Sequence, residues 1–267
     1  MSRGPRWLLA GWYGLAIAFL FAPILISIVY SFNLGVLGKQ TARFTGWTLQ
    51  WYPAAWADLS LRVAVGTSFQ LAFWAALIVL LIGPMLGLAL VRHPWAKVRT
   101  LLALVTYLLV IVPEVVIGVS LLLFFATLQI PLGLATLAVS VTPGGIAVMA
   151  LIVRARALTL DPRLEDAAAD LGSSAFMTFW LIILPQLRPA ILAGGLMAYA
   201  FCFDNLVISS FLTTANVTTL PVYLFGSLQY QPSPVIYVAA GFVFIFTTIL
   251  LGLAGFLLRA PREGIIT

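Results

Sequence analysis

The sequence has few of the residues that catalytic sites and soluble surfaces need. Only 8% of its 267 residues are charged, and it contains one histidine and one cysteine. A single cysteine, Cys202, excludes a disulfide within the chain and a cysteine metal cluster. The phosphate-binding pattern G-x-x-x-x-G-K-[ST] does not occur either. We therefore expect no bound cofactor and no catalytic or ATP-hydrolysing role for this chain.

Apolar residues make up most of the composition. Hydrophobic side chains account for 63% of residues, and the mean hydropathy is +1.11, whereas soluble domains contain about 45–50% apolar residues. Too few polar residues remain to cover the surface of a soluble core. The composition predicts an all-α integral membrane protein.

Six apolar runs are long enough to cross a bilayer, which takes about 20 residues in a helix. Their approximate limits are 7–32, 69–91, 101–128, 132–153, 182–212 and 235–258. The first run is too long for a removed signal peptide. Pro113, Pro143-Gly144-Gly145 and Gly194-Gly195 indicate kinks or close helix contacts. We expect one transmembrane domain of six helices over residues 1–267.

The basic residues predict the orientation of these helices, because cytoplasmic flanks carry an excess of Lys and Arg. If the N-terminus is cytoplasmic, only Lys39, Arg43 and Arg62 of the 14 basic residues lie outside. Both termini are then cytoplasmic, and so is the highly charged connection 154–181. The polar segment 33–68, which contains Asp58, is external.

The connection 154–181 predicts two short helices. Asp161 followed by Pro162 is typical of an N-cap and a first helical turn. Gly172 is the expected residue after the end of this first helix, and Ser173 or Ser174 can cap the second helix. We expect the second helix to place four apolar residues on one face: Phe176, Phe179, Trp180 and Ile183.

The first of these helices is amphipathic with an acidic polar side. Its apolar stripe consists of Leu164, Ala167, Ala168 and Leu171, and its acids are Glu165, Asp166 and Asp170. Helices that lie on lipid headgroups carry basic residues on the polar face, so these acids argue against a lipid surface. They favour a protein partner that receives the apolar stripe in a groove.

These residues also form a known motif. Asp166-Ala167-Ala168, Gly172 and Ile182-Ile183-Leu184-Pro185 resemble the EAA loop of permease subunits of ATP-binding-cassette (ABC) importers, with Asp166 in place of the usual glutamate. The resemblance implies the type I importer permease fold, in which the loop forms coupling helices.

The same resemblance implies a set of partners and a location. The coupling helices would dock on a cytoplasmic ATPase dimer that binds ATP and Mg. A second, homologous permease, membrane lipid and an extracytoplasmic substrate-binding protein would complete the assembly, in a bacterial inner or plasma membrane and without nucleic acid.

Other segments resemble the second permease of spermidine and putrescine importers. They are Tyr30-Ser31-Phe32-Asn33, residues 46–52, Pro113-Glu114 with Gly118, and Phe203-Asp204-Asn205 followed by Ser209-Ser210-Phe211. The resemblance implies a polyamine as the solute. Polyamine permeases commonly carry two adjacent acids where this chain has Asp204-Asn205, so a related importer of another small solute stays open.

Two acids, Glu114 and Asp204, fall inside apolar runs, where an ionisable residue is costly and marks a pathway. No Lys or Arg lies at comparable depth, so these acids favour a cationic passenger. With Asn205 and Ser209, they form the predicted substrate path. Structural roles are the alternative: Glu114 can cap the helix broken by Pro113, and Asp204 can bond to Asn205 or a neighbouring helix.

Two other classes of protein compete with a permease subunit. An enzyme would need a set of catalytic groups, and no motif supports Glu114 and Asp204 as a catalytic carboxylate pair. A self-contained secondary transporter would be expected to show inverted repeats with paired broken spans, and the sequence shows none.

Overall fold

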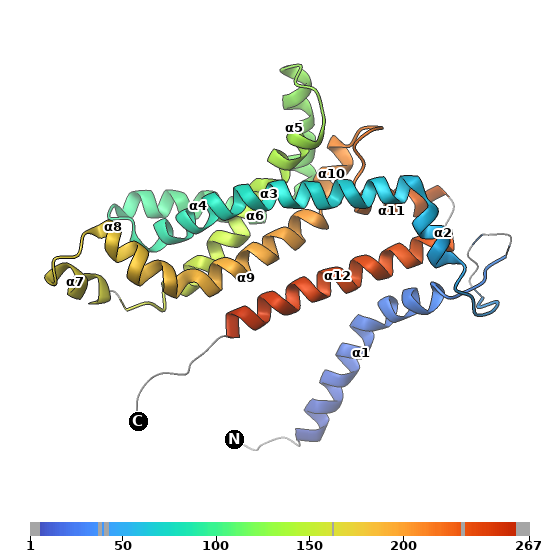
Figure 1. The fold of residues 1–267 in the computed structure, drawn as a ribbon, viewed down its shortest axis with the longest axis horizontal. Helices are drawn as coiled ribbons and strands as arrows, with labels where there is room; N and C mark the ends of the chain where they lie inside the picture. Colours follow the sequence, from blue (N-terminus) through green and yellow to red (C-terminus); the bar gives the residue numbers. More distant parts are fainter. Residues whose placement is uncertain (1–5, 37–38, 40–42, 162, 231–232, 260–267) are drawn as a thin grey trace. The chain divides into compact units, whose positions relative to one another are not determined.

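The structure is a computed structural model that describes residues 6–36, 39, 43–161, 163–230 and 233–259. Its regular secondary structure is helical (Figure 1), and the only β-type pairing in these ranges is isolated β-bridges such as Asn33 with Trp47. The all-α prediction is confirmed. The long helices are α1 (Arg6–Tyr30), α3 (Leu59–Arg92), α4 (Ala96–Ile111), α5 (Glu114–Thr127), α6 (Leu134–Ala157), α9 (Leu184–Phe203), α11 (Leu220–Tyr230) and α12 (Pro234–Arg259). The short ones are α2 (Trp51–Ala57), α7 (Arg163–Asp170), α8 (Ala175–Thr178), the π-helix η1 (Phe179–Ile183) and α10 (Val207–Leu212).

Five stretches of helix are long and apolar enough to cross a membrane. They are Gly11–Tyr30, Leu59–Arg92, Leu134–Ala157, Ala175–Phe203 and Pro234–Leu258, and a sixth is the pair α4 and α5, which bends by 99°. The apolar run 101–128, expected as one span, is therefore two helices (Figure 1). Pro113 lies at the break, because proline has no N–H for a continuous helix.

Two other expected spans differ from the helices. The run 182–212 is interrupted after Phe203, and helix resumes at Val207. The run 69–91 belongs to a helix that begins ten residues earlier, at Leu59, where the carboxylate of Asp58 accepts a hydrogen bond of 3.0 Å from the Leu61 N–H. A count of apolar residues does not detect such caps and breaks, because it contains no information on backbone hydrogen bonds.

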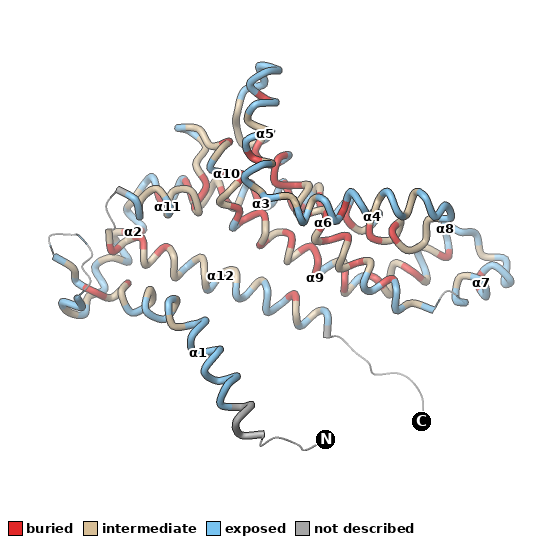
Figure 2. The backbone as a smooth tube through the Cα atoms, turned by 180° about the vertical axis from the view of Figure 1, so that it is seen from behind, coloured by how far each residue is buried: buried red, intermediate tan, exposed pale blue. Residues whose placement is uncertain are grey.

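The residues form two compact units, Met1–Arg62 with Tyr223–Thr247, and Val63–Val222 with Thr248–Thr267. In the first unit, α1 packs against α12 through aromatic side chains: the ring centroids of Phe21 and Phe244 lie 6.4 Å apart. Most of α1 is exposed (Figure 2), including its large apolar side chains. Such a surface needs lipid or another chain to cover it.

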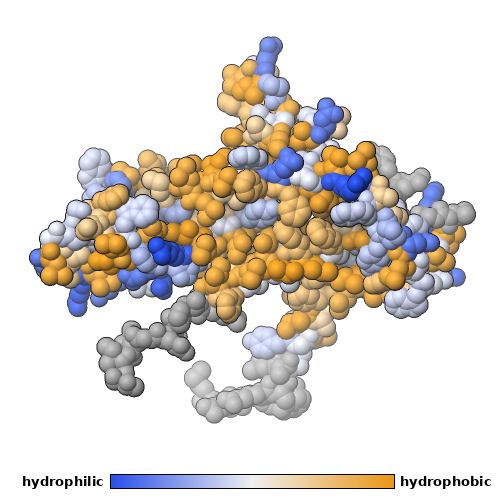
Figure 3. Space-filling model, in the orientation of Figure 1, coloured by the Kyte–Doolittle hydropathy of each residue, from blue (hydrophilic) through white to orange (hydrophobic). Residues whose placement is uncertain are grey.

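The core of the second unit lies between α3, α6 and α9, where buried residues concentrate (Figure 2). Many large apolar side chains are also exposed, and apolar residues cover much of the face shown in Figure 3. Glycines permit close approach of these helices. A Cβ added to Gly194 would lie 2.4 Å from the sulfur of Met149, and one added to Gly145 would lie 2.9 Å from Val79. The predicted close contacts at Gly144-Gly145 and Gly194-Gly195 are confirmed, with small residues at the helix interfaces.

The closest backbone approach in this core gives a testable expectation. A Cβ on Gly87 would lie 2.7 Å from the carbonyl oxygen of Ala150, which cannot rotate away as a side chain does. Gly87→Ala should therefore destabilise the chain by about 1–3 kcal/mol, the usual cost of overpacking. The measurement is the thermal unfolding midpoint of the full chain in detergent.

The matched control lies on the same helix. Gly66 has no atom within 4 Å of an added Cβ, so Gly66→Ala should leave the midpoint unchanged or raise it through better helix propensity. Equal midpoints for the two variants would contradict the tight contact between α3 and α6.

Candidate functional site

The loop between α6 and α9 begins with a capped helix. The Asp161 carboxylate accepts a hydrogen bond of 2.9 Å from the Arg163 N–H, and the N–H of Leu164 donates to the Asp161 carbonyl at 3.2 Å. Pro162 lies outside the described residues. These bonds satisfy N–H groups at the start of α7 that have no partner within the helix. The sequence pattern at Asp161 thus corresponds to the observed beginning of α7.

A glycine ends α7 in the left-handed backbone conformation. Gly172 has a φ of +78°. Its N–H donates to the carbonyl of Ala169 at 2.9 Å, and the N–H of Ser173 donates to that of Ala168, also at 2.9 Å. Together these two bonds form a Schellman motif, which satisfies carbonyls at the helix end. Gly172 therefore sets the direction in which the chain leaves α7.

The second helix is capped by Ser174, whose hydroxyl accepts a hydrogen bond of 3.3 Å from the Met177 N–H. It continues through η1 into α9, with Pro185 in the first turn. The expectation that Phe176, Phe179, Trp180 and Ile183 share one face is wrong. Ile183 belongs to the buried core cluster and Phe179 packs against it, whereas Phe176 and Trp180 are exposed. The wider π turn contains more residues than an α turn and shifts the periodicity.

An ion pair holds α7 to the end of α3. The Nε of Arg92 lies 3.1 Å from a carboxylate oxygen of Glu165, and the guanidinium also donates to the Leu160 carbonyl at 3.4 Å. Sequence reasoning placed Glu165 on the polar face but did not find this partner, which lies more than 70 residues earlier in the chain. The loop is thus attached to three helices, by the chain to α6 and α9 and by Arg92 to α3.

The rest of α7 presents a mixed acidic and apolar surface. Ala168 is buried, but Leu164 and Ala167 are exposed, and Leu171 is 89% exposed. Asp166 and Asp170 are also exposed. The apolar stripe expected from the sequence is therefore divided, with one residue packed inward and three uncovered. Exposed apolar side chains beside carboxylates are typical of a surface that another protein covers.

A second polar region lies at the break between α9 and α10. Asn205 is 5% exposed. Its side-chain oxygen accepts hydrogen bonds from the N–H groups of Ile208 at 3.1 Å and Ser209 at 3.3 Å, so it caps α10. Its amide nitrogen donates to the carboxylate of Glu114 at 3.2 Å. Asn205 thus joins α10 to the first turn of α5.

This arrangement explains the asparagine. A carboxylate at position 205 could cap α10 equally well, but it would have no N–H to donate to Glu114. Two carboxylates at this separation would repel each other. In the sequence, Asn205 stands where polyamine permeases commonly carry a second acid. In the structure, its side chain donates a hydrogen bond to the acid Glu114. Glu114 and Asn205 are 91 residues apart, so no local pattern could reveal the pair.

The other predicted path residues lie at the same break. Asp204 follows the last residue of α9 and is exposed. Ser209 on α10 is fully buried, and its hydroxyl has no hydrogen-bond partner among the described residues. Close packing brings α5 to α10, since a Cβ on Gly118 would lie 2.6 Å from the ring of Phe211. The structure therefore brings Glu114 and Asn205 into contact. Asp204 directly precedes Asn205 in the break, and Ser209 follows it on α10.

Sequence comparison relates the chain to transport proteins of bacteria. It is 32% identical over 247 residues to the putrescine transport system permease protein PotI of Escherichia coli, covering 90% of this chain and 84% of that protein. It is 30% identical over 258 residues to the spermidine/putrescine transport system permease protein PotC of the same species, covering 96% of both chains.

Solved structures of ABC transporters share the fold. One is a bacterial ABC transporter involved in the import of alginate, with a TM-score of 0.69 at 15% identity over 98% of this chain and 99% of that one. Another is the inward-facing methionine transporter MetNI, with a TM-score of 0.65 at 17% identity over 78% and 97%.

The family comparison covers the loop, the break, α6, α9 and the last part of α3 together. The match extends over residues 80–260, which include α7 and the Glu114–Asn205 pair. The chain belongs to the family of binding-protein-dependent transport system inner membrane components.

Proposed function

We propose that this chain is the permease subunit of an ATP-driven importer and forms half of the translocation path for a small cationic solute such as spermidine or putrescine. The observation that carries this proposal is the similarity to PotI and PotC over at least 90% of the chain. Both relatives are named as permeases of polyamine transport systems.

The charge of the polar break supports a cationic solute. Glu114 and Asp204 are acids within apolar sequence, and Glu114 keeps a hydrogen-bond donor, Asn205, rather than a basic partner. A donated hydrogen bond stabilises the carboxylate without cancelling its charge. Asp204 is exposed and therefore available to a solute. Acidic side chains along a path favour the passage of cations.

The exposed surface of α7 supports coupling to an ATPase. In the proposed mechanism, Leu164, Ala167 and Leu171 dock on a cytoplasmic ATPase dimer, which binds ATP and Mg and performs the hydrolysis. Closure of this dimer moves α7, and the helices rock against a second, homologous permease. This permease chain holds no cofactor of its own.

The same proposal fixes the orientation and the outer partner. Both termini and the coupling loop lie in the cytoplasm, and the assembly resides in the bacterial inner membrane. Most basic residues then lie on the cytoplasmic side. An extracytoplasmic binding protein delivers the solute.

Uptake by the reconstituted complex tests this function. Proteoliposomes that contain both permeases and the ATPase, supplied with the binding protein, should accumulate radiolabelled putrescine only when ATP is present with the ATPase. The matched control omits the ATPase subunit. Accumulation in that control would indicate a secondary transporter, and a binding protein that retains an uncharged solute instead would indicate an importer of another solute class.

A further inference from the structure

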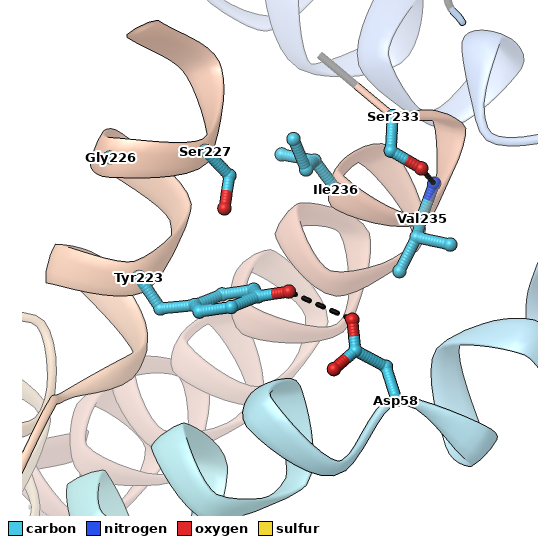
Figure 4. A pocket seen from close by; sticks show the side chains of 7 residues that line it. All are labelled: Asp58, Tyr223, Gly226, Ser227, Ser233, Val235 and Ile236. Carbon is cyan, nitrogen blue, oxygen red and sulfur yellow. Dashed lines mark hydrogen bonds between the residues drawn. The ribbon is translucent and has the colours of Figure 1, made fainter. Parts of the chain in front are cut away.

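A pocket in the first unit is lined by residues outside the proposed path and coupling loop. Its volume is about 430 Å³, within the range of roughly 300–1,000 Å³ that ligand pockets occupy. The lining comes from three places: Asp58 between α2 and α3, the middle of α11, and the start of α12 (Figure 4). Its residues are Asp58, Tyr223, Gly226, Ser227, Ser233, Val235 and Ile236.

The polar groups of the pocket are arranged around one carboxylate. The Tyr223 hydroxyl donates to Asp58 at 2.9 Å, and the Ser227 side chain points toward the same hydroxyl (Figure 4). Burial, and then Asp58, raise the pKa of Tyr223 to about 12. A phenol is protonated at neutral pH even at its ordinary pKa of about 10, and the raised pKa extends its donation to the carboxylate into more alkaline solution. Asp58 and the ring of Tyr223 are thus held in fixed positions at the pocket wall.

The carboxylate retains capacity for a further donor. One oxygen of Asp58 accepts from the Leu61 N–H and the other from Tyr223, whereas two carboxylate oxygens together offer about four lone-pair sites. Among the described residues, no Lys or Arg lines the pocket. The net charge of the lining is therefore negative, which favours a cation and disfavours a phosphate or carboxylate ligand.

The kind of cation follows from the remaining groups. A divalent metal ion needs about six or more oxygen ligands, usually with several carboxylates, and no group of three His, Cys, Asp or Glu suited to a metal occurs in the described part of the chain. An organic ammonium ion needs fewer carboxylate partners than a divalent metal ion does. It would be satisfied by Asp58, by serine hydroxyls and by the face of Tyr223 through a cation–π contact, while Val235 and Ile236 offer apolar contact for methylene groups.

We infer that this pocket binds a primary ammonium group. Two sources present that chemistry, a soluble alkylamine and the headgroup of phosphatidylethanolamine. The inference depends on the lining of the pocket alone and not on the identity of the transported solute, so it stands or falls separately from the proposed polyamine transport.

Binding of n-butylammonium to the full chain tests the inference. The chain is placed in phosphatidylcholine nanodiscs, which contain no primary amine, and binding is followed by saturation-transfer-difference NMR. We expect saturable binding of butylammonium and none of 1-butanol, which has similar size but no charge. Asp58→Asn should weaken binding at least tenfold. It removes the charge but keeps a side-chain oxygen to accept from the Leu61 N–H.

Two phenol variants serve as a matched pair. Tyr223→Phe keeps the ring and should change binding by no more than about threefold, since the carboxylate and the cation–π surface remain. Tyr52→Phe removes a phenol that is bonded to Ser31 and lies outside the pocket lining, and should change nothing. Binding to Asp58→Asn within twofold of the unmodified chain would overturn the inference, as would equal binding of 1-butanol.

The lipid composition of the discs distinguishes the two sources. If phosphatidylethanolamine in the disc competes with butylammonium, the lipid headgroup occupies the pocket. If it does not compete, the site belongs to soluble amines. Either result supports recognition of a primary ammonium, and absence of saturable binding in both kinds of disc would refute it.

Discussion

Replacement of Gly172 by valine is expected to reduce transport-coupled ATPase activity of the assembled complex at least tenfold, while the chain still inserts and assembles. Gly172 has a φ of +78°, and no atom lies within 4 Å of an added Cβ. The substitution therefore acts through the backbone conformation at position 172 and not through a clash with a neighbouring atom. The left-handed region costs an L-residue roughly 1–2 kcal/mol, and a β-branched side chain is an outlier there.

The expected size follows from that cost. A penalty of about 1.4 kcal/mol is a tenfold change in a conformational equilibrium. If the backbone of the Gly172→Val variant leaves the left-handed region, the two bonds that end α7 are lost, and α7 and α8 change their relative direction. The surface that contains Leu164 and Leu171 would then no longer fit the proposed ATPase partner. ATP hydrolysis by the complex, with and without the loaded binding protein, measures the effect.

Asparagine at the same position is the matched control. Asn tolerates the left-handed conformation better than other L-residues with a Cβ, so Gly172→Asn should keep coupled ATPase activity within about twofold. Undiminished activity in Gly172→Val would remove the docking role of this loop, as would equal loss in both variants.

Uptake of putrescine should fall at least tenfold in Asp204→Asn, measured as initial rate below saturation in proteoliposomes. The substitution preserves shape and removes the charge of the exposed acid at the end of α9. If Asp204 lies on the proposed path, loss of this attractive charge is expected to cost at least about 1.4 kcal/mol. Asp204→Glu, which keeps the charge, should retain most of the uptake.

The neighbouring Ser210 provides a control for local structure. Its hydroxyl is exposed and donates to the Val207 carbonyl at 2.7 Å, so Ser210→Ala should leave both uptake and assembly unchanged. If Asp204→Asn transports putrescine with unchanged kinetics, Asp204 has a structural role only, and the cationic path would rest on Glu114.

The features that sequence analysis predicted best are those set by neighbouring residues. Asp161 and Gly172 bound α7 because capping chemistry involves a few adjacent backbone groups. The apolar runs identified membrane helices because bilayer thickness sets their length. Gly145 and Gly194 lie at close helix contacts because small residues serve that purpose in many membrane proteins.

Features that depend on distant residues were missed or wrong. The Glu114–Asn205 bond and the Arg92–Glu165 ion pair join segments far apart in sequence, and no local pattern in either segment identifies its partner.

Two features of local backbone geometry were also missed or wrong. The predicted face of the second loop helix was wrong because a π turn changes the residue spacing. A kink at Pro113 was expected, but hydropathy alone reads 101–128 as one span and does not indicate that the bend between α4 and α5 reaches 99°.

The attachment of the coupling loop to three helices has a mechanical consequence. Gly87 on α3 and Gly194 on α9 allow both helices to approach α6 so closely that an added Cβ would meet Ala150 or Met149. A force applied to α7 by a docked partner would act on α6 and α9 through the chain and on α3 through Arg92. If α7 docks on the proposed ATPase, we therefore expect these attachments to move the three helices together rather than α7 alone.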